Sequence, residues 1–172
     1  MSIADFNGDG IMDLVTANSQ FFSVSLLLGI GDGSFDAPEF IPGGGFAQAV
    51  STGDFNGDGS VDFATVNTNN DTVSVFIGDG TGDFAPLVTY VTDDGPSAII
   101  SGDFDADGIA DLVTTNGAGV TGNTVSMFRG VGDGTFENQV VYAADTNCRT
   151  SDSVFLLDFS RTVWLAICLS YN

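Results

Sequence analysis

Acidic side chains recur at a fixed spacing three times in this chain. The acidic phrases begin at Asp5, Asp54 and Asp103, so each starts 49 residues after the one before. Within each nine-residue phrase, carboxylate or carboxamide groups occupy positions 1, 3, 5 and 9, and glycine occupies position 6. Such oxygen donors suit a hard cation, and Ca²⁺, which takes about six to eight oxygens, fits best. The sequence therefore predicts three loops that bind about three Ca²⁺ ions in total.

The remaining positions of each phrase fit the same interpretation. Glycine at position 6 permits a sharp turn around an ion, and position 7 would offer its backbone carbonyl, so its side chain need not be polar. The third phrase carries Asp105 and Ala106 where the others have Asn and Gly, and we expect Ala106 to keep ordinary backbone angles. The predicted metal ligands are Asp5, Asn7, Asp9, Ile11, Asp13, Asp54, Asn56, Asp58, Ser60, Asp62, Asp103, Asp105, Asp107, Ile109 and Asp111.

Two alternatives compete with a cation site of this kind. Solvated Asp/Asn/Gly turns occur singly in proteins, but carboxylates gathered three times at one register repel each other unless a cation is present. The helix-loop-helix calcium hand also begins Asp-x-Asn-x-Asp-Gly, and it needs an acidic residue at position 12. That position holds Thr16, Thr65 and Thr114, and β-rich sequence flanks the loops. Helical hands, dockerin modules included, are therefore rejected.

The sequence between the acidic phrases predicts an all-β fold. After each phrase comes a β-rich run ending in asparagine, then an alternating strand, then a Gly-Asp turn closed by phenylalanine. Further strands are predicted at 47–55, 87–91, 97–104 and 139–142. Four strands in about 50 residues match one blade of a β-propeller. We therefore expect an incomplete propeller of about three four-stranded antiparallel blades, over residues 1–42, 43–92 and 93–143.

The Gly-Asp turns contain acidic residues of their own, which are Asp32, Asp79, Asp83 and Asp133. These aspartates could form a second cation or ligand site, but tight turns are the favoured interpretation. The phenylalanines that close the turns, Phe35, Phe84 and Phe136, are expected to pack between blades.

The order of loop, strand and turn resembles the FG-GAP, or VCBS-type, repeats. The resemblance covers about residues 1–143 and includes Asp-Phe-Asn-Gly-Asp-Gly-x-x-Asp, Leu-Val-Thr-Ala-Asn and Gly-Asp-Gly-Ser-Phe. Such repeats build the β-propeller of integrin α-subunits and parts of many secreted bacterial proteins. The resemblance implies a secreted or cell-surface protein of cell adhesion, with Ca²⁺ bound by the acidic loops in β-hairpins on one face of the propeller.

Composition excludes several other classes of function. The chain has 23 acidic and 3 basic residues, no His, and a net charge of −20, so direct nucleic-acid binding is not expected. No signal peptide and no apolar run of membrane-spanning length occurs in the sequence. Because the location expected from the resemblance is extracellular, this sequence is expected to be a fragment of a longer chain.

The sequence from residue 144 onward departs from the repeat pattern. Residues 153–159 resemble the strand that leads into a fourth acidic phrase, but Ser160, Arg161 and Thr162 follow where Asn-Gly-Asp should. Residues 144–172 are therefore expected to be a divergent tail: a partial fourth repeat or a frame-shifted end. Cys148 and Cys168 could pair, but unpaired thiols are favoured.

The residues are compatible with three functions. The favoured one is a non-enzymatic propeller segment of an extracellular adhesion or ligand-binding protein, in which Ca²⁺ is structural. Its partner would be an unknown protein or glycan, and further blades of a longer chain or self-association would complete the ring. A carbohydrate-binding lectin is the alternative. A polysaccharide lyase or hydrolase is less expected, because the chain has no His, no Lys and only two Glu.

Overall fold

The computed structural model describes residues 1–117, 124–144, 154–159 and 163–168, the last two segments by their strand pairing alone. The described part is all-β apart from one short 3-10 helix. The strands are β1 (Ser2–Ala4), β2 (Asp13–Asn18), β3 (Ser23–Leu27), β4 (Glu39–Pro42), β5 (Ala47–Gly53), β6 (Asp62–Asn67), β7 (Thr72–Phe76), β8 (Val88–Val91), β9 (Pro96–Gly102), β10 (Asp111–Asn116), β11 (Thr124–Phe128), β12 (Val140–Ala143), β13 (Val154–Phe159) and β14 (Val163–Cys168), and the helix is η1 (Ser19–Phe21).

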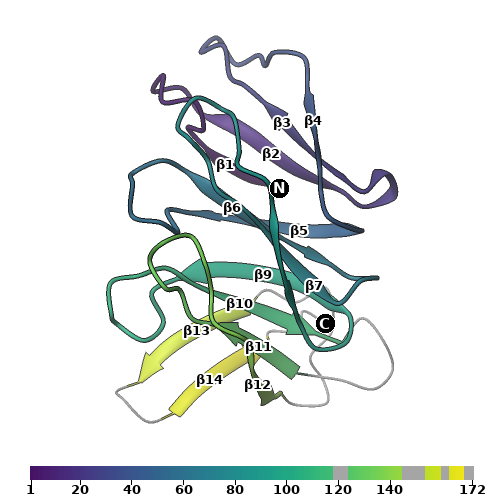
Figure 1. The fold of residues 1–172 in the computed structure, drawn as a ribbon, viewed down its shortest axis with the longest axis vertical. Coiled ribbons are helices and arrows are strands. Elements are labelled where there is room, and N and C mark those ends of the chain that lie inside the picture. The colour runs from purple at the N-terminus through teal and green to yellow at the C-terminus, as the bar shows by residue number, and fades with distance from the viewer. Residues whose placement is uncertain (118–123, 145–153, 160–162, 169–172) are drawn as a thin grey trace.

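Twelve of these strands form three antiparallel sheets with the same topology. Sheet 1 has the order β1-β2-β3-β4, sheet 2 the order β5-β6-β7-β8, and sheet 3 the order β9-β10-β11-β12. Each acidic phrase forms the loop between the first and second strands of its sheet. The predicted fold, an incomplete propeller of three four-stranded blades, is confirmed, and the described sheets do not close into a ring (Figure 1).

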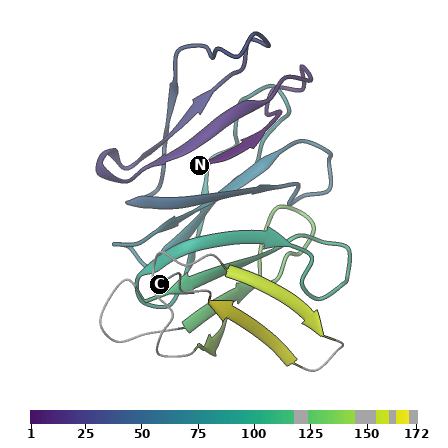
Figure 2. The same ribbon diagram turned by 180° about the vertical axis from the view of Figure 1, so that it is seen from behind.

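The three sheets are stacked in chain order along the long axis of the molecule (Figures 1 and 2). Stacking explains why β6 and β10 are buried at every residue, whereas β2 is fully buried only at Asp13 and Val15. Between sheets 1 and 2, Val15 and Leu26 share an apolar cluster with Phe63. A second cluster between sheets 2 and 3 contains Phe55, Ala64, Val66, Val73, Val75, Ile99, Leu112, Phe128 and Phe136.

The phenylalanines of the Gly-Asp turns join neighbouring sheets. The ring of Phe84 lies 6.0 Å from that of Phe6 in the first acidic loop, and the ring of Phe136 lies 5.5 Å from that of Phe55 in the second. The predicted packing between blades is confirmed at these two positions. It is wrong for Phe35, which is 44% exposed, because no sheet in the described part of the chain precedes sheet 1.

Hydroxyl groups connect the first strands of the three sheets. Ser2 Oγ lies 2.9 Å from Thr52 Oγ1, which joins β1 to β5. Ser51 Oγ lies 3.0 Å from Ser101 Oγ, which joins β5 to β9 at the equivalent place in the repeat. Each stacking interface thus combines an apolar cluster with one hydroxyl pair.

The tail contributes the antiparallel pair β13 and β14, which pair from Val154 with Cys168 to Phe159 with Val163. β13 falls where the sequence resembles the strand before a fourth acidic phrase, but residues 160–162 lie outside the described part. The limits of the three repeats and the origin of residues 144–172 stay predictions. The expectation that Cys148 and Cys168 are unpaired also stays a prediction, because Cys148 lies outside the described residues. Within the described segments, no helix is both long enough and apolar enough to cross a membrane.

Candidate metal centre in the acidic loops

The aspartate at position 1 organises each acidic loop by accepting hydrogen bonds from loop amides. Asp5 Oδ1 accepts a bond of 2.8 Å from Gly8 N, and Asp5 Oδ2 accepts one of 2.8 Å from Gly10 N. Asp54 accepts equivalent bonds from Gly57 N at 2.7 Å and Gly59 N at 3.0 Å. The same curled backbone thus forms around this carboxylate in at least the first two loops.

Asp103 begins the third loop and follows the pattern with one change. Its Oδ2 accepts a bond of 3.0 Å from Gly108 N, as in the other loops. Its Oδ1 accepts one of 3.1 Å from Asp107 N, whereas Asp54 Oδ1 takes the amide one residue earlier in its loop, that of Gly57. The third loop therefore keeps the curl with a slightly different set of bonds.

Positions 3 and 5 lie next to each other at the exposed tip of the loop. Asn7 Nδ2 donates to Asp9 Oδ2 at 3.0 Å, and Asn56 Nδ2 donates to Asp58 Oδ2 at 2.8 Å. The carboxylate at position 5 also accepts the amide of position 7, as Ser60 N donates to Asp58 Oδ1 at 2.6 Å. That amide, followed by the Asn56 side chain, holds the pKa of Asp58 below its ordinary value.

The aspartate at position 9 is buried and bridges two segments of its own sheet. Asp13 is 0% exposed, and its two oxygens accept bonds of 2.8 Å from Phe6 N and 2.8 Å from Gly29 N. Gly29 belongs to the Gly-Asp turn, so the carboxylate fastens the acidic loop to that turn. Asp62 bridges Phe55 N and Gly78 N, and Asp111 bridges Phe104 N and Gly130 N.

Burial disfavours the charged form of the carboxylates of Asp62 and Asp111. Desolvation raises the pKa of Asp62, and the negative charges of Asp58 and Asp54 add to the rise, while the two backbone hydrogen bonds oppose it. Desolvation likewise raises the pKa of Asp111, with smaller contributions from Asp105 and Asp107. A cation in the loop would favour ionisation of Asp62 and Asp111, because its positive charge would offset both the loss of solvation and the neighbouring negative charges.

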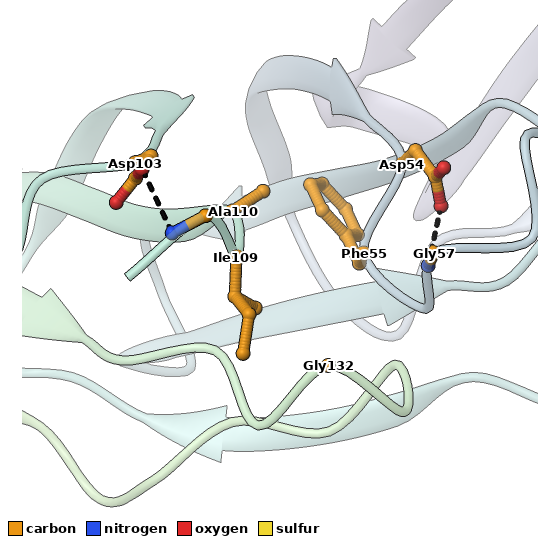
Figure 3. Close-up of a pocket in the computed structure, with 8 residues that line it drawn as sticks. Asp54, Phe55, Gly57, Asp103, Ile109, Ala110 and Gly132 are labelled. Atoms are coloured by element: carbon orange, nitrogen blue, oxygen red, sulfur yellow. Dashed lines mark hydrogen bonds between the residues drawn. The ribbon is translucent and has the colours of Figure 1, made fainter. Parts of the chain in front are cut away.

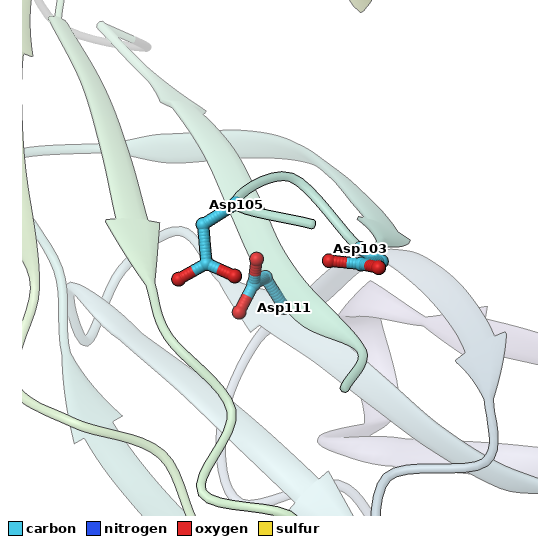
Figure 4. Close-up of side chains that lie close together, drawn as sticks. All are labelled: Asp103, Asp105 and Asp111. Atoms are coloured by element: carbon cyan, nitrogen blue, oxygen red, sulfur yellow. The ribbon is translucent and has the colours of Figure 1, made fainter. Parts of the chain in front are cut away.

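The third loop brings three carboxylates together. Asp103, Asp105 and Asp111 each place one oxygen within 4.8 Å of the other two, and Figure 4 shows the three side chains converging. Asp107 lies outside this group of three, and its Oδ1 accepts the amide of Ile109 at 2.8 Å. Two carboxylates at this separation repel each other by roughly 3 kcal/mol at an effective dielectric constant near 20.

Arg129 partly offsets the extra charge of the third loop. Its Nε lies 3.7 Å from Asp105 Oδ2, with the Arg129 side chain 53% exposed. Leu28 and Ile77 occupy the equivalent place after the third strand of sheets 1 and 2. The sequence-based prediction missed Arg129, although aligning the three repeats puts the arginine and the additional aspartate in the same repeat.

Position 7 of the loop has a packing role that the sequence did not reveal. A side chain at Gly132 would lie 3.2 Å from Ile109 Cδ1, and one at Gly31 would lie 3.2 Å from Ile11 Cδ1. The isoleucine side chains therefore pack on the glycines of their own Gly-Asp turn. The role predicted for position 7, a carbonyl ligand, stays a prediction.

One expectation about the third loop is wrong. Ala106 has a φ of 64°, in the left-handed region, and not the ordinary backbone angles expected from sequence. Gly57 at the same position of the second loop has a φ of 74°. The loop needs this conformation to aim its following amides at the carboxylate of position 1, and an L-residue adopts it at a cost of roughly 1–2 kcal/mol.

The turn aspartates have a structural role, as favoured from sequence. Asp79 Oδ1 accepts bonds from Thr81 N at 2.9 Å and Thr81 Oγ1 at 2.7 Å, and these bonds, the hydroxyl first, lower the pKa of Asp79. Asp32 and Asp133 cap their turns in the same way through Ser34 and Thr135.

A pocket of about 390 Å³ lies between the second and third acidic loops (Figure 3). It is lined by Asp54, Phe55, Gly57, Asp103, Gly108, Ile109, Ala110 and Gly132. Asp54 and Asp103 flank the pocket and accept hydrogen bonds from backbone amides of their own loops. The pocket therefore presents carboxylates and glycine backbone at the junction of two repeats. Gly134 N donates to Phe55 O at 3.1 Å, which fastens the turn of sheet 3 to the second acidic loop.

The donors present in these loops suit Ca²⁺. Each loop supplies four side chains with oxygen donors at positions 1, 3, 5 and 9, and a carboxylate oxygen that accepts one N–H keeps a second lone pair for another partner. The convergence of Asp103, Asp105 and Asp111 gives such an ion a place between negative charges. When bound, the ion would supply the positive charge that these oxygens face.

Comparison with known proteins shows which family the chain belongs to. The family model described as FG-GAP-like repeat matches residues 5–65 and again residues 54–114, each match spanning two acidic loops. The chain belongs to the FG-GAP-like repeat family. A comparison with curated proteins gave no match to this FG-GAP-like chain.

Two solved structures resemble the FG-GAP-like chain in fold. One is an Agrocybe aegerita lectin that recognises non-reducing terminal N-acetylglucosamine, with a TM-score of 0.62 and 22% identity over 92% of this chain. The other is the Photorhabdus luminescens Tc holotoxin pore, with a TM-score of 0.53 and 22% identity over 91% of this chain. This chain spans 42% of the lectin chain and 8% of the toxin chain. At this identity the likeness concerns the fold, a segment of a β-propeller.

Proposed function

We propose that this β-propeller segment is a calcium-binding, non-enzymatic part of an extracellular adhesion or ligand-binding protein, in which the ions stabilise the structure. The observation that carries the proposal is the convergence of the Asp103, Asp105 and Asp111 carboxylates in a loop that shares its curled backbone with two others. The three carboxylates repel one another at this separation, and a bound cation would offset that repulsion.

A structural role for the ions follows from what the loops hold together. The buried carboxylate of Asp62 joins its loop to the Gly-Asp turn of the same sheet, and Phe55 of the same loop packs on Phe136 of the next sheet. An ion that fixes the loop would therefore fix both the edge of one sheet and its contact with the next. The sequence contains neither histidine nor lysine as a general base, which favours a non-enzymatic function.

Thermal unfolding tests the proposal. The midpoint temperature should rise by several degrees when Ca²⁺ is added to chelator-treated protein and fall again with excess chelator, because ligands that bind only the folded state stabilise it. Mg²⁺ at the same concentration serves as the control, since its smaller octahedral shell suits these loops less well. Equal midpoints with Ca²⁺ and with chelator would contradict a structural calcium role.

A carbohydrate-binding lectin is the second candidate. It is favoured by one observation, the pocket of about 390 Å³ between two repeats, whose rim carries Asp54 and Asp103. Carboxylates and backbone groups can hydrogen-bond sugar hydroxyls, but Phe55 is 1% exposed and offers little stacking surface. The test is binding to a glycan array, which this candidate expects to be lost with chelator; an array without binding would eliminate it.

A further inference from the structure

The sequence contains three Asn-Gly pairs, which are Asn7-Gly8, Asn56-Gly57 and Asn116-Gly117. The first two lie in the first and second acidic loops, and the third lies at the end of β10. In such a pair the backbone nitrogen of glycine can attack the side-chain carbonyl carbon of asparagine, because glycine has no side chain to obstruct the approach. The three pairs share this chemistry but have different surroundings in the fold.

The attacking nitrogen is hydrogen-bonded to a carboxylate in both acidic loops. Gly8 N donates to Asp5 Oδ1 at 2.8 Å. Gly57 N donates to Asp54 Oδ1 at 2.7 Å, as Figure 3 shows. A carboxylate at this distance is placed to accept the N–H proton while the nitrogen forms a new bond, which is the role of a general base.

The carbonyl group under attack is polarised in the same two loops. Asn7 Oδ1 accepts the amide of Asp9 at 3.1 Å, and Asn56 Oδ1 accepts the amide of Asp58 at 3.0 Å. A backbone N–H in this place stabilises the negative charge that develops on the oxygen when its carbon is attacked. Each loop therefore combines a nucleophile, a general base and a polarised carbonyl within one turn.

Asn116 has a different environment. It is 5% exposed, and its Nδ2 donates to Ser126 Oγ at 2.7 Å and to Thr124 Oγ1 at 3.1 Å. The amide of Gly117 donates to Gly95 O at 3.0 Å, and a peptide carbonyl is a far weaker base than a carboxylate. Asn116 is therefore a control for the two loop asparagines within the same chain.

The third acidic loop provides another internal comparison. Asp105 and Ala106 replace the Asn-Gly pair there, so that position has no side-chain amide from which ammonia could be lost. Asp105 also shows the charge that the other two loops would gain if their asparagines became aspartates.

We propose that Asn7 and Asn56 are sites of deamidation that their own loops promote. In the first loop, Gly8 N forms a bond to Asn7 Cγ and gives its proton to Asp5. The bond between Asn7 Cγ and Nδ2 breaks, and the nitrogen leaves as ammonia after taking a proton through solvent. Water then opens the five-membered imide at either carbonyl and gives aspartate or isoaspartate at residue 7. The second loop reacts in the same way, and the sum is the exchange of an amide and water for an acid and ammonia.

Solvent access and backbone geometry decide the consequence. Asn7 and Asn56 are partly exposed, and the glycines after them are exposed, so water reaches both reacting groups. Aspartate as the product adds a carboxylate to the loop. Isoaspartate lengthens the backbone by one carbon and would displace the amides of Gly8 and Gly10 from Asp5, which ends the curl of the first loop. The reaction uses only contacts within the loop and does not rest on calcium binding.

Peptide mapping by mass spectrometry tests this proposal on the full chain, incubated in chelator at neutral pH and physiological temperature. Asn7 and Asn56 are expected to convert at least about tenfold faster than Asn116. Asp5→Asn should slow conversion at Asn7 by about tenfold or more and leave Asn56 unchanged, because asparagine keeps an oxygen that accepts the Gly8 amide but is not a base. Asp54→Asn is the matched variant, expected to slow only Asn56.

The same incubation in urea separates the effect of the loop from that of the local sequence. In the unfolded chain the three asparagines are expected to convert at similar rates, and Asp5→Asn is expected to have no effect. The proposal would be overturned if Asn7 and Asn56 stayed intact in the folded chain, or if Asn116 converted as fast as they do. It would equally be overturned if Asp5→Asn left Asn7 as reactive as in wild type or more so, or if its effect persisted in urea.

Discussion

Arg129 and Asp105 form an ion pair, with 3.7 Å between Nε and Oδ2, at two places where the third repeat departs from the others. The first two repeats carry Leu28 with Asn7, and Ile77 with Asn56, at these positions. The third repeat thus adds one negative and one positive charge together. The formal charge near this loop then stays close to that of the other two.

Breaking this pair should affect metal affinity more than stability. Because Arg129 is 53% exposed, Arg129→Leu should lower the free energy of unfolding of the metal-free protein by less than about 1 kcal/mol. The same change should strengthen Ca²⁺ binding at the third loop, since it removes a competing cation. A double-mutant cycle with Asp105→Asn, followed by urea unfolding and calcium titration, measures both effects. A variant that binds Ca²⁺ more weakly than wild type would contradict a competing role for Arg129.

The left-handed conformation of Ala106 predicts that exchanging alanine and glycine has opposite effects on stability in the third and second loops. Ala106→Gly should raise the free energy of unfolding by roughly 0.5–1 kcal/mol, because glycine adopts a φ of 64° without steric strain. Gly57→Ala should lower it by roughly 1 kcal/mol, and no atom lies within 4 Å of the added methyl group, so the effect is one of backbone conformation. Urea unfolding in chelator measures both, and equal signs for the two changes would refute this effect of backbone conformation.

Two equivalent phenylalanines, Phe35 and Phe136, are expected to contribute differently to the free energy of unfolding. Phe136→Ala should cost about 3–5 kcal/mol of unfolding free energy, since Phe136 is 6% exposed and contacts Phe55 and Tyr90. Phe35→Ala should cost less than about 1 kcal/mol, because Phe35 is 44% exposed. Similar losses at the two positions would mean that Phe35 packs inside the folded chain.

The capped turns predict a specific acid sensitivity. The Thr81 hydroxyl and amide lower the pKa of Asp79 in the folded protein below its ordinary value of 3.8. The stabilisation from this carboxylate is therefore complete above pH 3.8 and decreases as the pH falls through the lower folded-state pKa. The difference in unfolding free energy between wild type and Asp79→Ala should be constant at neutral pH and shrink as the pH falls below 3.8. A difference that grows on acidification would have the wrong sign.

Much of the fold was predictable from sequence because it repeats. Each acidic phrase, strand and turn occurs three times, so three weak local signals support one another, and the strands found at 13–18, 62–67 and 111–116 follow their phrases as expected. The packing of Phe84 and Phe136 was predictable for the same reason. The exposure of Phe35 was not, because its pattern implies a preceding sheet, and the described part of the chain contains none before sheet 1.

The candidate site was only partly predictable. Spacing indicates which oxygens can converge, but it does not show that both oxygens of Asp13 accept the amides of Phe6 and Gly29. The second of these contacts joins segments 16 residues apart, and glycine has no side chain to signal it. The conformation of Ala106 was misjudged because the loop geometry, and not the preference of alanine, sets its φ.

Calorimetric titration of the metal-free chain with Ca²⁺ is the decisive measurement for the acidic loops. About three ions per chain are expected, and one fewer for each of Asp5→Asn, Asp54→Asn and Asp103→Asn, because every loop carries one of these residues at its first position and binds about one ion. The unfolding midpoint should fall in step with the ions lost. A wild type that shows no saturable binding, or a triple variant that binds as many ions as wild type, would contradict the assignment of calcium to these loops.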